Sequence, residues 1–154
     1  MPETTPDSAY PPRQTGVTGW EHFHHVADVG VRGSGPCPGQ AFEQAAMAMI
    51  AVVSDPESVN ALDTIEFRCE APNLELLLVD WLNAVVYEIA TRKMLLSRFE
   101  VTIDGPRLEG KLWGEAVMTE KHHPAVEVKG ATFTSLRVAQ EADGRWVAQC
   151  VVDV

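Results

Sequence analysis

Hydrophobic and polar residues alternate near the start of the chain. Within residues 19–33 the apolar side chains share one parity: Phe23, Ala27, Val29 and Val31. The polar side chains share the other parity: His22, His24, Asp28 and Arg32. Because successive side chains of a strand point to opposite faces, this pattern predicts a strand or a hairpin.

Two later segments repeat their apolar residues at intervals of three and four, which is the spacing of one helix face. The first is AFEQAAMAMIAVVS, residues 41–54, which follows the Gly- and Pro-rich segment GSGPCPG. The second is LELLLVDWLNAVVYEIA, residues 74–90, for which Asn73 is a suitable N-cap. An extended run, residues 62–69, lies between these two predicted helices.

From Leu96 onward the sequence pattern predicts strands almost throughout. The four predicted segments are SRFEVTIDG, RLEGKLWGEAV, VEVKGATFTSLRVAQ and RWVAQCVVDV, and a hairpin loop, EADG, joins the last two. The predicted fold class is therefore α+β, with two helices packed on a large, mainly antiparallel or mixed β-sheet.

The composition is that of a single globular domain. The chain has 154 residues, 45% of them hydrophobic and 22% charged, and no apolar run reaches the 18 residues of a membrane span. We expect a flexible N-terminal tail at residues 1–18, without the features of a secretory signal, followed by a domain at residues 19–154 and a cytoplasmic location. The net charge of −10 argues against strong direct binding of nucleic acid and for action through a partner.

Several kinds of chemistry are not indicated. The three cysteines, Cys37, Cys69 and Cys150, are far apart in the sequence, which argues against a disulfide framework and a closed zinc site. Cys69 and Cys150 also lie in apolar runs, where a thiol behaves as a small hydrophobic group rather than a nucleophile. The sequence contains no P-loop, dinucleotide-binding, GxSxG or HExxH motif.

A cluster of histidines in the first predicted strand is one candidate metal site, since imidazole binds transition metals. Because of strand alternation, His22 and His24 share one face and His25 takes the other, so at most two of the three converge. A structural or solvent-facing role for these histidines is therefore the favoured interpretation.

Two aspartates in apolar strands, Asp28 in ADVGV and Asp153 in CVVDV, form a second candidate site. If the two strands are neighbours, the carboxylates meet. At about 4 Å they repel by about 4 kcal/mol at an effective dielectric of 20, so the pair needs a shared proton, a cationic side chain or a divalent ion. Two carboxylates and a backbone carbonyl suit calcium, magnesium or manganese. The alternative, which the residues taken alone favour, is that each aspartate caps a strand end or pairs separately with Arg or Lys.

Lys129 in VEVKGATF lies on the polar side of its predicted strand, next to Gly130. Its ammonium group is either the counter-ion of a surface ion pair or part of an anion and metal site beside the aspartates. Asp80 and Asn83 flank the apolar stripe of the second helix, which favours a mostly structural role for them.

Five segments together cover about residues 19–154: HHVADVGV, AFEQAAMAM, LLLVDWLNAVVYEIATRKMLLSRFEV, KHHPAVEVKGATF and the terminal VVDV. Their order and spacing resemble those of the archease family. The resemblance implies a non-catalytic accessory protein of an RtcB-type RNA ligase in tRNA splicing and RNA repair. Members of this family promote guanylylation of the ligase and its multiple turnover.

The resemblance also implies roles for single residues. Asp28 and Asp153 correspond to metal-binding acids of the family, with the carbonyl of Val154 as a third ligand of a weakly held Ca, Mg or Mn ion. Lys129 corresponds to a lysine needed for activation of the ligase. Two other functions remain open at this point: an autonomous hydrolase dependent on a divalent metal, and a chaperone-like interaction module for RNA-processing proteins.

Overall fold

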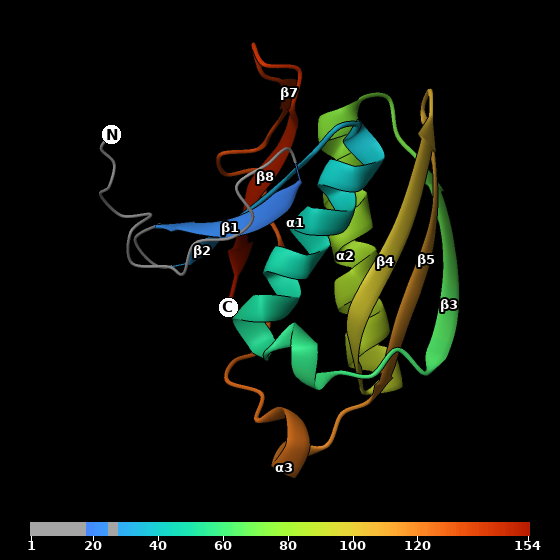
Figure 1. Cartoon of the computed structure of the whole chain (residues 1–154), viewed down its shortest axis with the longest axis vertical. Coiled ribbons are helices and arrows are strands. Elements are labelled where there is room, and N and C mark those ends of the chain that lie inside the picture. Colours follow the sequence, from blue (N-terminus) through green and yellow to red (C-terminus); the bar gives the residue numbers. More distant parts are fainter. Residues whose placement is uncertain (1–17, 25–27) are drawn as a thin grey trace.

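The computed structural model describes residues 18–24 and 28–154 of the chain. The tail expected at residues 1–18 lies outside the described part except for Thr18, as does His25. Figure 1 shows the arrangement of the described elements, in which two helices lie between two β-sheets.

The first sheet, sheet A, contains the predicted N-terminal hairpin. Its strands are β1 (Gly19–His24), β2 (Val29–Gly35), β8 (Trp146–Asp153), β6 (Gly130–Ala131) and β7 (Arg137–Gln140). The strand order is β1-β2-β8, and the short strands β6 and β7 both pair with the remaining edge of β8. All of these pairings are antiparallel.

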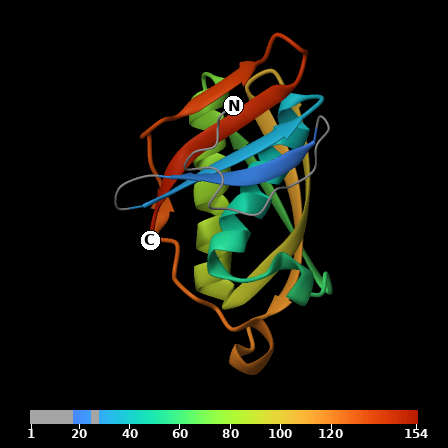
Figure 2. The ribbon, with the colours of Figure 1, turned by 60° about the vertical axis from the view of Figure 1, so that its left-hand side comes forward.

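The second sheet, sheet B, has the order β3-β5-β4 and is also antiparallel. Its strands are β3 (Asp63–Glu70), β5 (Arg107–Ala116) and β4 (Met94–Asp104). The helices are α1 (Pro38–Val53), α2 (Leu74–Arg92) and the short α3 (Thr119–His122), together with a 3-10 helix, η2 (Pro56–Ser58). Seen from a second direction, α1 and α2 again separate the two sheets (Figure 2).

Helix α1 packs against both sheets, and this explains why the strands do not form one sheet. On one side, a Cβ at Gly33 of β2 would stand only 2.2 Å from the backbone nitrogen of Ala45. On the other, a Cβ at Gly39 of α1 would stand 2.5 Å from the carbonyl oxygen of Val101 in β4. The α+β class is confirmed, but two antiparallel sheets replace the single large sheet because a helix that is apolar on two sides must be covered on both.

Helix α2 begins at the predicted N-cap, since the side chain of Asn73 accepts a hydrogen bond of 2.9 Å from the backbone N–H of Leu76. At its centre the buried Trp81 donates its indole N–H to the carbonyl of Phe42 in α1, at 3.1 Å. The same ring meets Phe99 of β4 edge-on, with centroids 5.8 Å apart. Trp81 thus joins both helices and sheet B in one core.

The segment between β5 and β8 differs most from the prediction. Only β6 and β7 form within the continuous strand predicted for residues 126–140, and α3 precedes them. The break falls where the Thr132 hydroxyl accepts the N–H of Thr134 and Ser135 takes a left-handed backbone conformation. A local side-chain hydrogen bond and a left-handed residue both end strand pairing, whatever the side-chain alternation. Among the described residues, no helix has the length and apolar character needed to cross a membrane.

Candidate functional site

The two candidate aspartates lie at the same end of sheet A. Val29 of β2 pairs with Val152 of β8 at the end of this ladder. Asp28 directly precedes β2, and Asp153 is the last residue of β8, so each is the next residue of its segment beyond this pair. Because Val152 packs into the core beside the helices, strand alternation directs Asp153 to the outer face of sheet A. We call Asp28 and Asp153 the acid pair.

Lys129 is held at the same strand end through its main chain. Its backbone N–H donates to the carbonyl of Asp153 at 2.8 Å, and the next residue, Gly130, pairs with Asp153 in the ladder. The register therefore places Lys129 beside Val154. The carbonyl of Asp153 accepts this hydrogen bond from Lys129. The one main-chain oxygen in the predicted ligand set is the carbonyl of Val154.

Helix α2 contacts β6, the short strand that follows Lys129. The side-chain oxygen of Asn83 accepts the N–H of Ala131 in β6 at 2.9 Å. A polar side chain that flanks the apolar stripe of α2 thus satisfies a main-chain donor one residue beyond Gly130. This hydrogen bond is the structural role predicted for Asn83. It positions β6, the strand that directly follows Lys129.

No ion pair or side-chain hydrogen bond joins Asp28, Asp153 or Lys129 to any other residue in the described part of the chain. Separate ion pairs for the aspartates, one alternative left open by the sequence, are therefore not observed among these residues. Asp153 and Lys129 are exposed and Asp28 is partly buried. The acid pair thus contributes two carboxylates at one end of sheet A that have no ion-pair partner among the described residues.

The donors at this end of the sheet fit a hard divalent ion, because all of them are oxygens. Over residues 18–24 and 28–154, no group of three or more His, Cys, Asp or Glu side chains is arranged to hold a metal. A metal site here would consist of the two carboxylates, a main-chain carbonyl and water. Such an open site binds more loosely than a closed cage of protein ligands.

The histidine cluster is divided by the structure. His22 donates from Nε2 to the carbonyl of Ala48 at 2.7 Å, and the centroid of its ring lies 5.2 Å from that of Trp20. These contacts join β1 to α1 and support the structural interpretation of His22. The side chain of His24 and all of His25 lie outside the described residues.

A second charged group, which the sequence analysis did not select, lies beside α3. One carboxylate oxygen of Glu115 accepts three hydrogen bonds: from Lys121 Nζ at 2.7 Å, from the backbone N–H of Asn60 at 2.9 Å and from His122 Nε2 at 2.9 Å. We call Glu115, Lys121 and His122 the buried network, because Glu115 and His122 are almost inaccessible to solvent. Alternation gave no signal for it, since Glu115 shares the parity of the exposed Glu109 and Lys111.

Every polar atom of the His122 ring has a partner. Nδ1 accepts the backbone N–H of Met118 at 2.9 Å, so the ring proton resides on Nε2 and is donated to Glu115. The hydrogen bond from Lys121, followed by those from Asn60 and His122, lowers the pKa of Glu115 to about 2. The hydrogen bonds of His122 and Glu115 together anchor α3 to β5.

The cysteines agree with the absence of thiol chemistry predicted from the sequence. Burial raises the pKa of Cys150 to about 12, and burial followed by the charge of Asp80 raises the pKa of Cys69 to about 11. Neither thiol is ionised near neutral pH. Cys37, at the start of α1, is exposed.

The model of the Archease protein family matches residues 20–154 of this chain. The chain belongs to the archease family. Its relatives include the archease of Thermococcus gammatolerans, 37% identical, and that of Pyrococcus furiosus, 36% identical. Each alignment covers 88% of this chain and 98% of the relative.

Two solved structures share the fold. The solution structure of Methanobacterium thermoautotrophicum protein 1598 has a TM-score of 0.76 and 31% sequence identity, covering 88% of this chain and 99% of that one. The crystal structure of an archease described as a possible chaperone, from Thermotoga maritima, has a TM-score of 0.58 at 16% identity, covering 86% of this chain and 94% of that one. This second likeness supports the fold alone.

Proposed function

We propose that this archease is an accessory protein that activates an RtcB-type RNA ligase in tRNA splicing and RNA repair. Its part is to promote guanylylation and multiple turnover of the ligase, through the acid pair at the end of sheet A. It joins no RNA itself.

One observation supports this proposal above all others: Asp28 and Asp153 lie at the same end of sheet A, next to the paired Val29 and Val152, and neither has an ion-pair partner among the described residues. Placing two like charges together is unfavourable unless something outside the fold uses them. The pair is therefore suited to an intermolecular role, with a metal ion, a cationic surface of the ligase or both.

The acid pair and the carbonyl of Val154 would hold a divalent ion such as Ca, Mg or Mn, and a bound ion supplies positive charge that neutralises phosphate oxygens. The chain contributes the orientation of this end of the sheet. Main-chain bonds fix Asp153 against Lys129, and Asn83 fixes the neighbouring strand. Lys129, which carries no internal ion pair among the described residues, would contact a phosphate or an acidic group of the ligase.

The test measures self-guanylylation and repeated RNA joining by the purified cognate RtcB-type ligase, with GTP and manganese, in the presence and absence of this protein. The wild-type chain should stimulate both reactions, and Asp28→Ala should remove the stimulation. Asp104→Ala is the matched control, because Asp104 is an exposed aspartate at the end of β4 in sheet B. Full stimulation by Asp28→Ala would contradict the proposed site, and no stimulation by the wild-type chain would contradict the proposed function.

A chaperone-like module is the second candidate, and one observation favours it. Exposed Val117, Met118 and Val126 lie near an apolar cavity of about 190 Å³, which Val117 and Val126 line together with Met94 and Ile89. A chaperone would protect client proteins without requiring Asp28. The third function considered, an autonomous hydrolase, would turn over substrate without the ligase.

A further inference from the structure

A polar cavity of about 310 Å³ lies on the outer face of sheet A, towards the end opposite the acid pair. Three arginines line it: Arg32 of β2, Arg137 of β7 and Arg145, which immediately precedes β8. Two carboxylates, Glu21 and Glu141, line it as well, so the formal charge of the lining is +1. In a chain with 12 basic residues and a net charge of −10, this local excess of positive charge is unusual.

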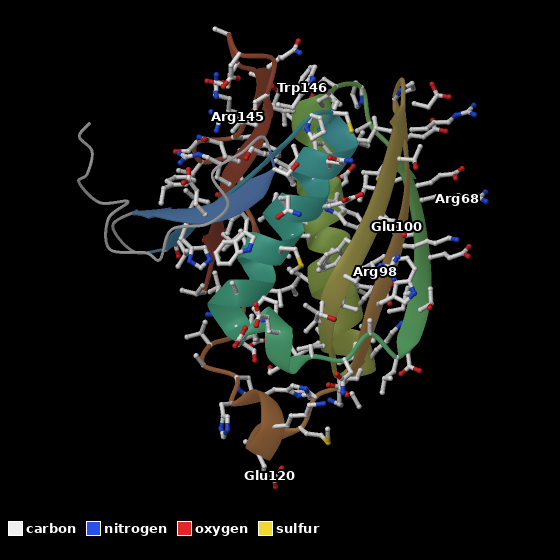
Figure 3. All side chains as sticks on the ribbon, viewed as in Figure 1. Arg68, Arg98, Glu100, Glu120, Arg145 and Trp146 are labelled. Atoms are coloured by element: carbon white, nitrogen blue, oxygen red, sulfur yellow. The ribbon has the colours of Figure 1, made fainter. Side chains whose placement is uncertain are left out.

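The pairing register explains why these arginines converge. Arg32 lies opposite Gln149 in the β2–β8 ladder, and Gln149 lies opposite Arg137 in the β7–β8 ladder. Arg145 has the same parity along its strand as Gln149, so it points to the same face. Figure 3 shows Arg145 on the side of β8 away from the helices, whereas Trp146 lies on the helix side.

The three guanidinium groups differ in their partners. Arg32 is paired with Glu21 and donates from Nε to the side-chain oxygen of Gln149 at 2.9 Å. Arg137 is paired with Glu141 at 2.7 Å. The guanidinium of Arg145 forms no hydrogen bond or ion pair with any residue in the described part of the chain, and its Nε is buried.

A permanently charged, partly buried guanidinium with no acceptor is costly to the free protein, and an anion would relieve that cost. Guanidinium groups line the cavity from β2, from β7 and from the residue that precedes β8, so several donors surround one space. A phosphate group has more acceptor oxygens than a carboxylate and can use more of these donors at once. The +1 charge of the lining also favours an anion.

We infer that this arginine cavity is a binding site for a phosphate group, with Arg145 as its principal donor. The site is separate from the acid pair and requires neither the ligase nor a metal ion. The phosphate belongs either to free inorganic phosphate or to a phosphate monoester such as a nucleotide, and the shared chemistry is the tetrahedral oxyanion.

The test follows the arginine Nε–H signals of the ¹⁵N-labelled full chain by NMR while inorganic phosphate, GMP or guanosine is added at a constant ionic strength near 0.15 M, so that general screening does not change. Phosphate and GMP should shift the Arg145 signal in a saturable manner, and guanosine should not. Tighter binding of GMP than of inorganic phosphate would indicate a nucleotide as the source, and equal binding would indicate the free ion.

Arg145→Gln should weaken phosphate binding at least fivefold, measured on the Arg32 and Arg137 signals. Arg68→Gln, which removes an exposed arginine of sheet B (Figure 3), should leave it unchanged. A non-saturable response, or equal binding by Arg145→Gln and the wild type, would overturn the inference. Because the measurement does not involve the ligase, its failure and a failure of the proposed activation are distinguishable.

Discussion

The carboxylates of the acid pair and of the buried network differ in whether the fold supplies them with hydrogen-bond and ion-pair partners. Glu115 is buried, and its carboxylate receives three donors from within the fold. Asp28 and Asp153 lie at the same end of sheet A, and neither forms an ion pair with a described residue. The difference follows from burial, because a buried charge without a partner destabilises the fold, whereas a solvated one is tolerated.

This comparison separates stability from function. Residues of the buried network are satisfied internally, so changing them should affect folding and leave the surface chemistry intact. The acid pair is not satisfied internally, so changing it should affect what the protein binds and leave folding intact. Each prediction below tests one side of this contrast.

The largest effect is expected at the acid pair. Asp28→Asn and Asp153→Asn should each reduce stimulation of the ligase at least tenfold, because both carboxylates serve one site. The double variant should be little worse than either single one, since the effects of residues that act as a unit do not add. Urea unfolding of the same variants should give free energies within about 0.5 kcal/mol of the wild type, because neither carboxylate has a side-chain hydrogen bond or ion pair to a described residue.

His122→Leu should have the reverse effect. It leaves the N–H of Met118 without its acceptor and removes one donor from Glu115, both in a buried setting. The free energy of unfolding should fall by about 2 kcal/mol. Stimulation of the ligase, measured at a temperature where the variant remains folded, should match the wild type. His123→Leu is the control, since His123 is exposed and adjacent. An intact free energy of unfolding in His122→Leu would remove the structural role assigned to the network.

The pH dependence of stability should report Glu115. Its pKa is about 2 in the folded chain, below the ordinary value of 4.5. The stability it contributes is therefore complete above pH 4.5 and is lost as the pH falls from about 4.5 to about 2. The difference in free energy of unfolding between the wild type and Glu115→Gln should be greatest at pH 6 and should shrink across that interval. A difference that stays constant down to pH 2 would show that Glu115 is not held as a carboxylate.

The smallest effect is expected at Asn83, which connects the helix layer to the acid pair. Asn83→Ala removes the acceptor of the Ala131 N–H, at a cost of about 1 kcal/mol in the free energy of unfolding. It should also lower stimulation of the ligase by a few-fold, because β6 carries Lys129 at its edge. Asn83→Asp keeps the acceptor and should restore both quantities. Failure of Asn83→Asp to do so would mean that the amide acts in some other way.

Local patterns in the sequence determined most of the elements. Asn73 before an apolar stripe of period 3.6 predicted the start of α2, and the alternating residues 19–33 predicted the β1–β2 hairpin. The opposite parity of Asp28 and Asp153 to their valine neighbours also followed from the sequence, because strand alternation is a local property. The break at residues 132–135 was not predicted, because alternation carries no information about it. The break depends on a hydroxyl hydrogen bond and a residue in the left-handed backbone conformation.

Other features exist only because of long-range pairing. The sequence did not reveal that β2 and β8, more than 100 residues apart, are neighbours, with Asp28 and Asp153 at the same end of the sheet. Nor did it reveal that three arginines share a cavity on the outer face of that sheet. The division of the strands into two sheets could not be predicted from the sequence either. Nor could the hydrogen bonds that Glu115 accepts from Asn60 and Lys121. Register and burial depend on how separate segments pack against one another, and a residue's own neighbours in the chain carry little information about that choice.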